Sequence, residues 1–145
     1  MNIPTLEEVI KRAKLHPSRV FIVYLFGSRI YGNYNSSSDY DFIVVANNSV
    51  ESIEIKNDLF NIHVYTPNKF QEDLDWHRIN NLECIFAPDW AKLKEDRNWE
   101  LKFDSAKLRH ATSHISSNSW VKSKKKLLQG DYYQGIKSLF HSIRI

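Results

Sequence analysis

Hydrophobic residues in the first two thirds of the chain occur in two kinds of pattern. Residues 19–26 and 40–46 are short and almost continuously apolar, which is typical of buried strands. Residues 50–55 and 59–66 instead mix polar and apolar positions in alternation, and each segment follows turn residues. The pattern therefore predicts four strands, with the last two in hairpin-like succession.

Helical signals surround these strands. Thr5 and Glu8 form a capping box that opens a first helix, and Pro17 ends it. Another helix is expected to begin at Pro67, and residues 82–86 form a further helical or buried segment.

The last part of the chain predicts three helices. The first begins after Asp104, the second spans residues 120–128, and the third begins after Asp131. The apolar pattern of the third helix is still running at Ile145, so either the helix ends with the chain or the chain is part of something longer. Four apolar residues of this helix have amphipathic spacing: Ile136, Leu139, Phe140 and Ile143.

Polar residues follow the first strand and open the second. Gly27-Ser28 comes directly after residues 19–26, whereas Asp39 and Asp41 flank one residue at the head of residues 40–46. Because side chains alternate faces along a strand, the two aspartates project from the same side. Two close carboxylates repel each other unless a cation lies between them, and Mg²⁺ prefers such oxygen ligands together with substrate phosphates. Since Gly27-Ser28 supplies N–H groups and a hydroxyl for phosphates, the segment predicts a site for a metal–nucleoside triphosphate.

The order and spacing of these residues resemble a known family. A hydrophobic run, Gly-Ser, a spacer of about ten residues and Asp-hydrophobic-Asp are the signature of the nucleotidyltransferase superfamily related to DNA polymerase beta. The chain is most similar to small stand-alone bacterial and phage members, and the resemblance is strongest over residues 20–45. It implies an α/β (α+β) fold, with a small mixed sheet flanked by helices. It also implies a catalytic core over residues 1–98 and a basic helical extension over residues 99–145, packed on that core.

The resemblance assigns roles to individual residues. Asp39 and Asp41 would be catalytic and would bind Mg²⁺ or Mn²⁺, with a nucleoside triphosphate as substrate. Arg29 is placed to add positive charge at the phosphates, although it can instead pair with a surface acid. Contacts to the nucleotide are expected from five residues: Gly27, Ser28, Arg29, Ser38 and Lys137.

The chain departs from the family pattern at one position. Family members carry a third carboxylate on a neighbouring strand, which helps to deprotonate the attacking hydroxyl, and the spacing places Asn61 there. An amide oxygen can coordinate a metal weakly, but an amide cannot act as a base. His63 follows on the same face and is either the proton acceptor or an ordinary sheet residue. Asp58 is the nearest acid, and its turn position makes it a poor substitute.

Charge is distributed unevenly along the chain, whose formal net charge is +3. Residues 1–100 carry 11 Lys and Arg against 15 Asp and Glu, whereas residues 101–145 carry nine against two. A basic C-terminal part suits contact with phosphates or nucleic acid, and four lysines cluster there: Lys122, Lys124, Lys125 and Lys126. The other interpretation is a solvated basic face without a ligand.

Composition predicts an ordinary globular chain in the cytoplasm. Hydrophobic residues make up 42% of the 145 residues, and no apolar run is long enough to cross a membrane. The N-terminal residues include Glu7 and Glu8 and lack the pattern of a signal peptide. The single Cys84 excludes an internal disulfide and fits a reducing compartment.

These observations predict a metal-dependent nucleotidyltransferase. It would move a nucleoside monophosphate from an NTP to an acceptor hydroxyl and release pyrophosphate. An RNA 3′ end is favoured as acceptor by the basic C-terminal part, and a protein hydroxyl comes second. The alternative is a degenerate family member that binds nucleotide or nucleic acid without turnover. The sequence leaves the oligomeric state open.

Overall fold

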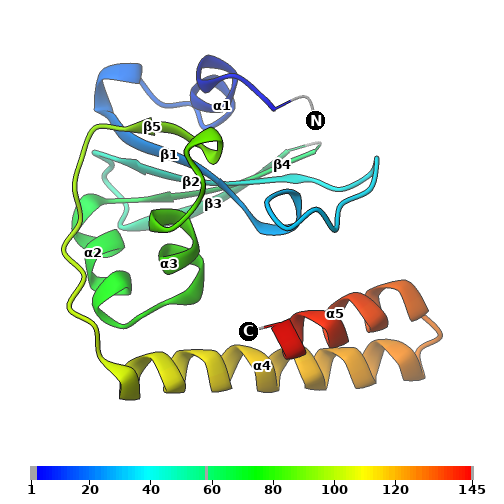
Figure 1. The fold of residues 1–145 in the computed structure, drawn as a ribbon. Coiled ribbons are helices and arrows are strands. Elements are labelled where there is room, and N and C mark those ends of the chain that lie inside the picture. The colour runs from blue at the N-terminus through cyan, green and yellow to red at the C-terminus, as the bar shows by residue number, and fades with distance from the viewer. Residues whose placement is uncertain (1–2, 58, 145) are drawn as a thin grey trace. The chain divides into compact units, whose positions relative to one another are not determined.

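The computed structural model describes residues 3–57 and 59–144, which form two compact units that divide after Lys102. The first unit contains a five-stranded sheet of order β3-β4-β2-β1-β5 (Figure 1). β2 and β4 are parallel, and the other neighbouring strands are antiparallel. This arrangement confirms the expected mixed α/β fold. The strands are β1 Val20–Phe26, β2 Tyr40–Ala46, β3 Ser52–Asn57, β4 Phe60–Tyr65 and β5 Lys92–Glu95.

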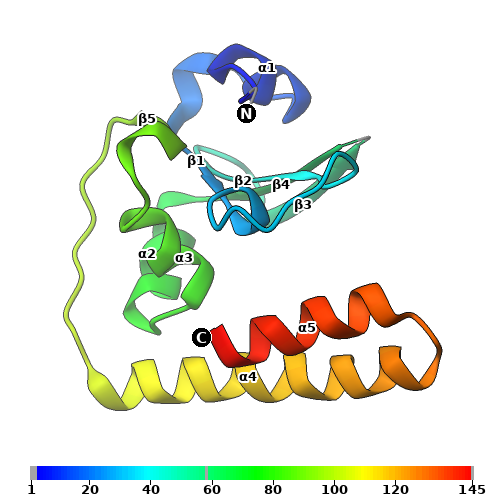
Figure 2. The same ribbon diagram turned by 45° about the vertical axis from the view of Figure 1, so that its right-hand side comes forward.

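Helices cover both faces of this sheet. α1 lies on one face, and α2 and α3 lie on the other, as both views show (Figures 1 and 2). Side chains of β1 and β2 alternate between the two layers, so that Phe42 packs with the α1 side while Ile43 packs beside α2 and α3. The second layer also buries Cys84 completely, and burial raises the pKa of its thiol well above the usual value. The helices of this unit are α1 Leu6–Arg12, α2 Pro67–Asp75 and α3 Ile79–Ile85, with short 3₁₀ turns η1 Pro17–Arg19, η2 Gly27–Arg29 and η3 Asp89–Ala91.

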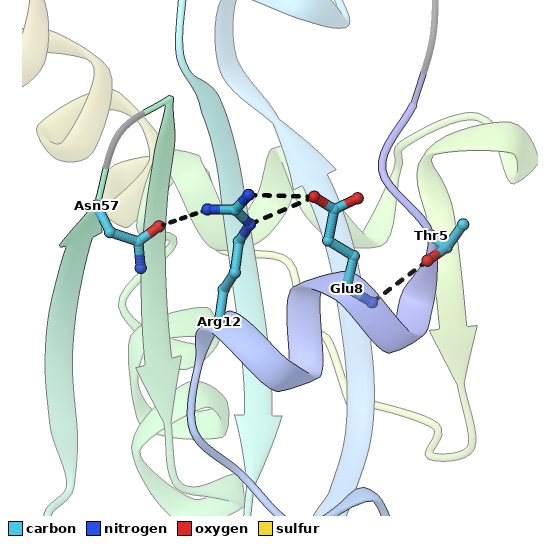
Figure 3. A network of polar contacts seen from close by, with 4 residues as sticks. All are labelled: Thr5, Glu8, Arg12 and Asn57. Atoms are coloured by element: carbon cyan, nitrogen blue, oxygen red, sulfur yellow. Dashed lines mark hydrogen bonds and ion pairs between the residues drawn. The ribbon is translucent and has the colours of Figure 1, made fainter.

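α1 is capped as predicted and is fastened to the sheet by one arginine. The Thr5 hydroxyl accepts a hydrogen bond from the Glu8 backbone N–H at 3.3 Å, which satisfies a free donor of the first turn. Arg12 donates to the Glu8 carboxylate and, at 3.3 Å, to the side-chain oxygen of Asn57 at the end of β3 (Figure 3). Its guanidinium also lies 4.0 Å from the centre of the Phe60 ring. Arg12 therefore ties α1 to the end of β3 and the start of β4.

The strand boundaries follow the sequence patterns closely in the centre of the sheet and less closely at its edges. β2 has the predicted bounds, and β1 begins one residue later than predicted. β3 is displaced by two residues, and β5 was not predicted. β5 has charged residues at three of its four positions and lacks an apolar pattern, because only one of its edges is paired. The Tyr24 hydroxyl donates to the Glu95 carboxylate and fastens this short strand to β1.

The second unit is a helical hairpin of α4 Ser105–Leu128 and α5 Tyr132–Arg144. The prediction of two helices before Gly130 was wrong, because α4 runs without a break through the segment 116–119. The serines and Asn118 of that segment lower helix propensity without stopping a helix, since neither glycine nor proline is present. Asp104 caps α4 as predicted, by accepting from two backbone N–H groups. In the described part of the chain, no helix combines the length and apolar character needed to cross a membrane.

Small residues of α5 pack against α4. The buried positions of α5 are Gly135, Ser138 and Ser142, and the Ser123 hydroxyl of α4 donates to the Gly135 carbonyl at 2.8 Å. Close helix contact of this kind leaves little room for large side chains. Three apolar residues of the predicted stripe are consequently exposed instead of facing α4: Ile136, Phe140 and Ile143.

We expect Gly135→Ala to destabilise this hairpin. An added Cβ would lie 2.6 Å from a methyl carbon of Leu127 and 3.2 Å from the Leu127 backbone nitrogen. Overpacking of this kind costs about 1–3 kcal/mol. Alanine gains about 1 kcal/mol in helix propensity over glycine, so we expect a net loss of up to about 2 kcal/mol. Urea unfolding and amide exchange along α5 would measure the loss. Gln134→Ala is the matched control, and equal effects of both substitutions would contradict a tight contact at Gly135.

Candidate active site

Three strand ends meet at one edge of the sheet. Because β1 is antiparallel to β2 and β4 is parallel to it, the end of β1 adjoins the starts of β2 and β4. The register places Phe26, Asp41 and Asn61 side by side on these three strands. The predicted Gly-Ser and Asp-x-Asp segments are therefore neighbours in the fold.

Gly27 is required at its position for two reasons. Its φ is +75°, in the left-handed region that favours glycine. An added Cβ would also lie 2.6 Å from Oδ2 of Asp41, far inside van der Waals contact. The backbone after β1 thus leaves room for the Asp41 carboxylate, which lies directly against it.

The two aspartates differ in exposure. Asp39 is exposed and immediately precedes β2, whereas Asp41 is the second residue of β2 and is half-buried. Alternation along β2 places Asp41 on the side opposite Tyr40, and the same alternation continued back by one residue predicts that side for Asp39. Asp41 is held in place by Asn61, whose side-chain nitrogen donates to Asp41 Oδ1 at 3.1 Å. The site is consequently built from one fixed and one exposed carboxylate.

Asn61 lies directly opposite Asp41 in the parallel register of β2 and β4, and its assignment to the position of the third family carboxylate stays a prediction. Its side-chain nitrogen also lies 3.3 Å from Nε2 of His63, so the amide bridges these two side chains. The Asn61 Oδ1 atom is buried and has no hydrogen-bond partner. Asn61 therefore acts as a donor to Asp41, and it adds no negative charge to the site.

Glu54 is a polar neighbour that the sequence analysis missed. It pairs with His63 in the β3–β4 register, and its Oε1 lies 3.6 Å from His63 Nε2. A hydrogen bond from Lys56 at 3.0 Å is the main reason that the pKa of Glu54 is lowered, with His63 and Asn61 adding to it. The alternation of residues 50–55 opposite residues 59–66 would have revealed this pair if the register had been known.

Several side chains that were expected to contact the nucleotide instead form hydrogen bonds within the loop between β1 and β2. The Ser38 hydroxyl accepts from the Asn35 backbone N–H at 3.0 Å and donates to Asn35 Oδ1 at 3.1 Å. Arg29 is buried, and it donates to the backbone carbonyls of Ser38 and Asp39 instead of pairing with a surface acid. Ser28 is also buried, and its carbonyl accepts from the Asn33 N–H at 3.2 Å.

The structure does not relate two further residues of the sequence analysis to this site. Lys137 is a half-buried residue of α5 in the second unit, so its contact with a triphosphate stays a prediction. Asp58 lies outside the described residues.

The two carboxylates suit a divalent cation that prefers oxygen ligands. Among the described residues, no three or more His, Cys, Asp and Glu side chains group as a metal site. Asp39 and Asp41 supply two carboxylates, and the lack of a side chain at Gly27 lets Asp41 approach the end of β1. Because Mg²⁺ is usually held by one or two carboxylates and completes its shell with water and phosphates, these residues fit it.

The comparison with protein families agrees with this geometry. The family model described as Polymerase beta, Nucleotidyltransferase matches residues 7–92, which include all three strand ends of the site. The chain belongs to the polymerase beta nucleotidyltransferase family.

The other comparisons are more distant. Among solved structures, a nucleotidyltransferase-like protein from Exiguobacterium sibiricum matches with 11% sequence identity and a TM-score of 0.43. The match covers 95% of this chain and 52% of that one, so the chain spans about half the length of that protein. No curated protein sequence matches this chain.

We expect Gly27→Ala to weaken metal binding as well as stability. The left-handed backbone costs a side chain about 1–2 kcal/mol, and the new methyl group would displace the Asp41 carboxylate. The dissociation constant for Mn²⁺ in the presence of a non-hydrolysable nucleotide should rise by about tenfold or more. Paramagnetic resonance of free Mn²⁺ would measure it.

Gly32→Ala provides a matched control. Gly32 has a φ of +73°, and nothing lies within 4 Å of the position of its missing Cβ. This substitution should cost similar stability and leave Mn²⁺ binding unchanged. If both variants lose Mn²⁺ binding equally, the contact with Asp41 is not what makes Gly27 necessary.

Proposed function

We propose that this member of the family transfers a nucleoside monophosphate from an NTP to an acceptor hydroxyl in a Mg²⁺- or Mn²⁺-dependent reaction. The observation that carries the proposal is the position of Asp41 against Gly27, with Asp39 two residues before it. This arrangement brings an oxygen ligand set next to the Gly-Ser segment, as transfer from a metal–triphosphate requires.

Each residue of the site has a proposed part in this reaction. Asp39 and Asp41 hold the metal, which when bound offsets charge on the triphosphate and lowers the pKa of the acceptor hydroxyl. Asn61 keeps the Asp41 carboxylate oriented through its 3.1 Å hydrogen bond. Gly27 and Ser28 bind the phosphates at the end of β1, and Lys137 is a further candidate for this role.

Among the described residues, His63 is a candidate base for the acceptor proton. His63 Nε2 is the proposed proton acceptor, and its protonation requires the Asn61 amide nitrogen 3.3 Å away to turn from it; the Glu54 carboxylate lies 3.6 Å from the same atom. Lys56 competes for the same Glu54 oxygen at 3.0 Å. His63 is therefore proposed as the base in place of the missing acid, with Glu54 as its partner.

RNA is the favoured acceptor because of the second unit. Residues 101–145 carry nine Lys and Arg against two Asp and Glu, and four of the lysines lie in the last two turns of α4. Trp120 is half-exposed beside them, and the Lys124 ammonium lies 5.8 Å from its ring. Basic side chains bind nucleic-acid backbones, and exposed aromatic rings stack with unpaired bases. A protein hydroxyl is the second candidate acceptor.

A second function is favoured by one observation. Asn61 occupies the place opposite Asp41 and supplies a neutral amide there. A site without a third carboxylate is suited to binding nucleotide or nucleic acid without turnover. The two functions differ in whether pyrophosphate is released.

Label transfer tests the proposal. The protein is incubated with each α-labelled NTP, with Mg²⁺ or Mn²⁺, and with separate pools of RNA and cell protein. Label in one pool identifies the acceptor class, and Asp39→Ala or Asp41→Ala should reduce transfer by about 10²–10³-fold or more. Full activity of purified Asp39→Ala would place the chemistry elsewhere. Saturable NTP binding without label in either pool would support the non-catalytic function.

Asn61→Asp should strengthen metal binding and increase transfer. A carboxylate at this position adds a charged ligand, which should lower the Mn²⁺ dissociation constant by about tenfold. Without metal the new charge would lie near Asp41 and lower the free energy of unfolding by about 1–3 kcal/mol. Thermal unfolding with and without Mn²⁺ would reveal this metal dependence.

Asn61→Ala separates the two effects. It removes the hydrogen bond to Asp41 without adding charge, so it should weaken Mn²⁺ binding where Asn61→Asp strengthens it. The same change in both variants would show that the charge of this position does not matter to the metal.

A further inference from the structure

Arg29 is the charged residue that the fold hides next to the site. It follows Gly27-Ser28 in η2, and only 7% of it is exposed. A guanidinium keeps its charge under all ordinary conditions, so burial requires partners that replace water. Arg29 finds these partners in backbone carbonyls and aromatic rings.

Two consecutive carbonyls accept from the Arg29 guanidinium. Nε donates to the carbonyl oxygen of Asp39 at 3.1 Å, and Nη2 donates to the carbonyl oxygen of Ser38. The planar fork of an arginine holds two acceptors in one fixed plane, a geometry that the rotating ammonium of a lysine does not impose. The fixed carbonyls belong to the backbone directly before β2, where the Asp39 carboxylate is attached.

Two tyrosine rings enclose the same guanidinium. Its central carbon lies 3.6 Å from the centre of the Tyr40 ring and 5.0 Å from that of the Tyr34 ring. Tyr34 belongs to the loop between β1 and β2, and Tyr40 is the first residue of β2. Cation–π contact with both rings therefore joins the loop to the start of the strand.

The position of Tyr40 also decides what Arg29 can reach. Tyr40 points to the opposite face of the strand from Asp39 and Asp41, because successive side chains alternate. Its ring lies 5.6 Å from that of Phe60 on the α1 side of the sheet, whereas Asp41 lies beside Phe26. The guanidinium stacked on Tyr40 is thus directed away from the face that carries the carboxylates.

We infer that Arg29 is a positioning residue, not a phosphate ligand: it fixes the backbone at Ser38 and Asp39 so that the Asp39 carboxylate is held on the same side as Asp41. The expected effect on Mn²⁺ binding rests on the proposed function, whereas the expected effect on amide exchange does not. These contacts of Arg29 with two carbonyls and two tyrosine rings, which we call the clamp, form before any ligand binds. Their loss should therefore change the backbone before β2 in the free protein as well as metal binding.

Amide exchange in the metal-free, full-length protein tests the clamp directly. The loop holds hydrogen-bonded reporters, since the N–H groups of Asn33, Ser38 and Tyr40 donate to the carbonyls of Ser28, Asn35 and Leu59. Arg29→Lys keeps the charge and loses the fork, so exchange at these amides should accelerate by about tenfold or more while amides of β1 keep their protection. Unchanged exchange at the three amides would overturn the inference.

Ligand binding provides the second readout. Arg29→Lys should raise the Mn²⁺ dissociation constant by about 10–100-fold, as loss of a supporting residue typically does, and leave affinity for metal-free ATP unchanged. Lower affinity for metal-free ATP with unchanged exchange would instead make Arg29 a phosphate ligand. If the wild-type protein binds no Mn²⁺ with a non-hydrolysable NTP, the proposed function fails, and the exchange experiment still decides the inference.

Four variants make the result specific. In Arg29→Ala, added guanidinium at non-denaturing concentration should restore loop protection. Arg12→Ala also removes an arginine stacked on a ring, that of Phe60, and should lower stability without a selective change at the loop amides. If Arg29 variants do not fold, Tyr34→Leu should accelerate loop exchange where Tyr34→Phe, which keeps the ring, does not. Identical behaviour of the two Tyr34 variants would then contradict the clamp.

Discussion

The contact between the backbone of Gly27 and the carboxylate of Asp41 constrains everything at this edge of the sheet. A left-handed residue must end β1, and the strand next to it must carry its acid where a Cβ would have been. A side chain added at residue 27 could not avoid this contact by rotating, because its Cβ is fixed by the backbone. The loop, the start of β2 and the row across to β4 are all built around this contact.

The segment with Asp39 and Asp41 makes contacts on both faces of β2. On the α1 side, Arg29 binds its carbonyls and stacks on Tyr40. On the other side, Asn61 donates to Asp41 and links it to the His63–Glu54 pair. Because side chains alternate along a strand, the Arg29 guanidinium and the aspartate carboxylates lie on opposite faces of β2. Arg29 can therefore stabilise the start of β2 without neutralising the carboxylates.

Sequence patterns predict the centre of this fold well and its polar contacts poorly. The bounds of β2 follow from its continuous hydrophobic run. The place of Asn61 opposite Asp41 depends on the pairing of β2 with β4, which the sequence patterns did not predict. The cap at Thr5 follows from a local hydrogen bond. The role of Arg29 could not be predicted, since it depends on carbonyls nine and ten residues away that only the closed loop brings near.

The helical hairpin shows a different limit. The spacing of Ile136, Phe140 and Ile143 describes an apolar stripe correctly, but it does not say which surface the stripe meets. α4 and α5 approach through Ser123 and Gly135, and this small-residue contact has no strong hydropathy signal. Periodicity therefore predicted a helix here and did not predict its interface.

The solitary thiol of Cys84 gives this protein a built-in reporter of its own opening. Complete burial beneath the sheet keeps the sulfur protonated and out of reach of alkylating reagents. Alkylation can then proceed only when α3 separates from the sheet layer, since no other cysteine in the chain competes for the reagent. The rate of thiol modification therefore follows the opening of this layer of the first unit, without any label having to be introduced.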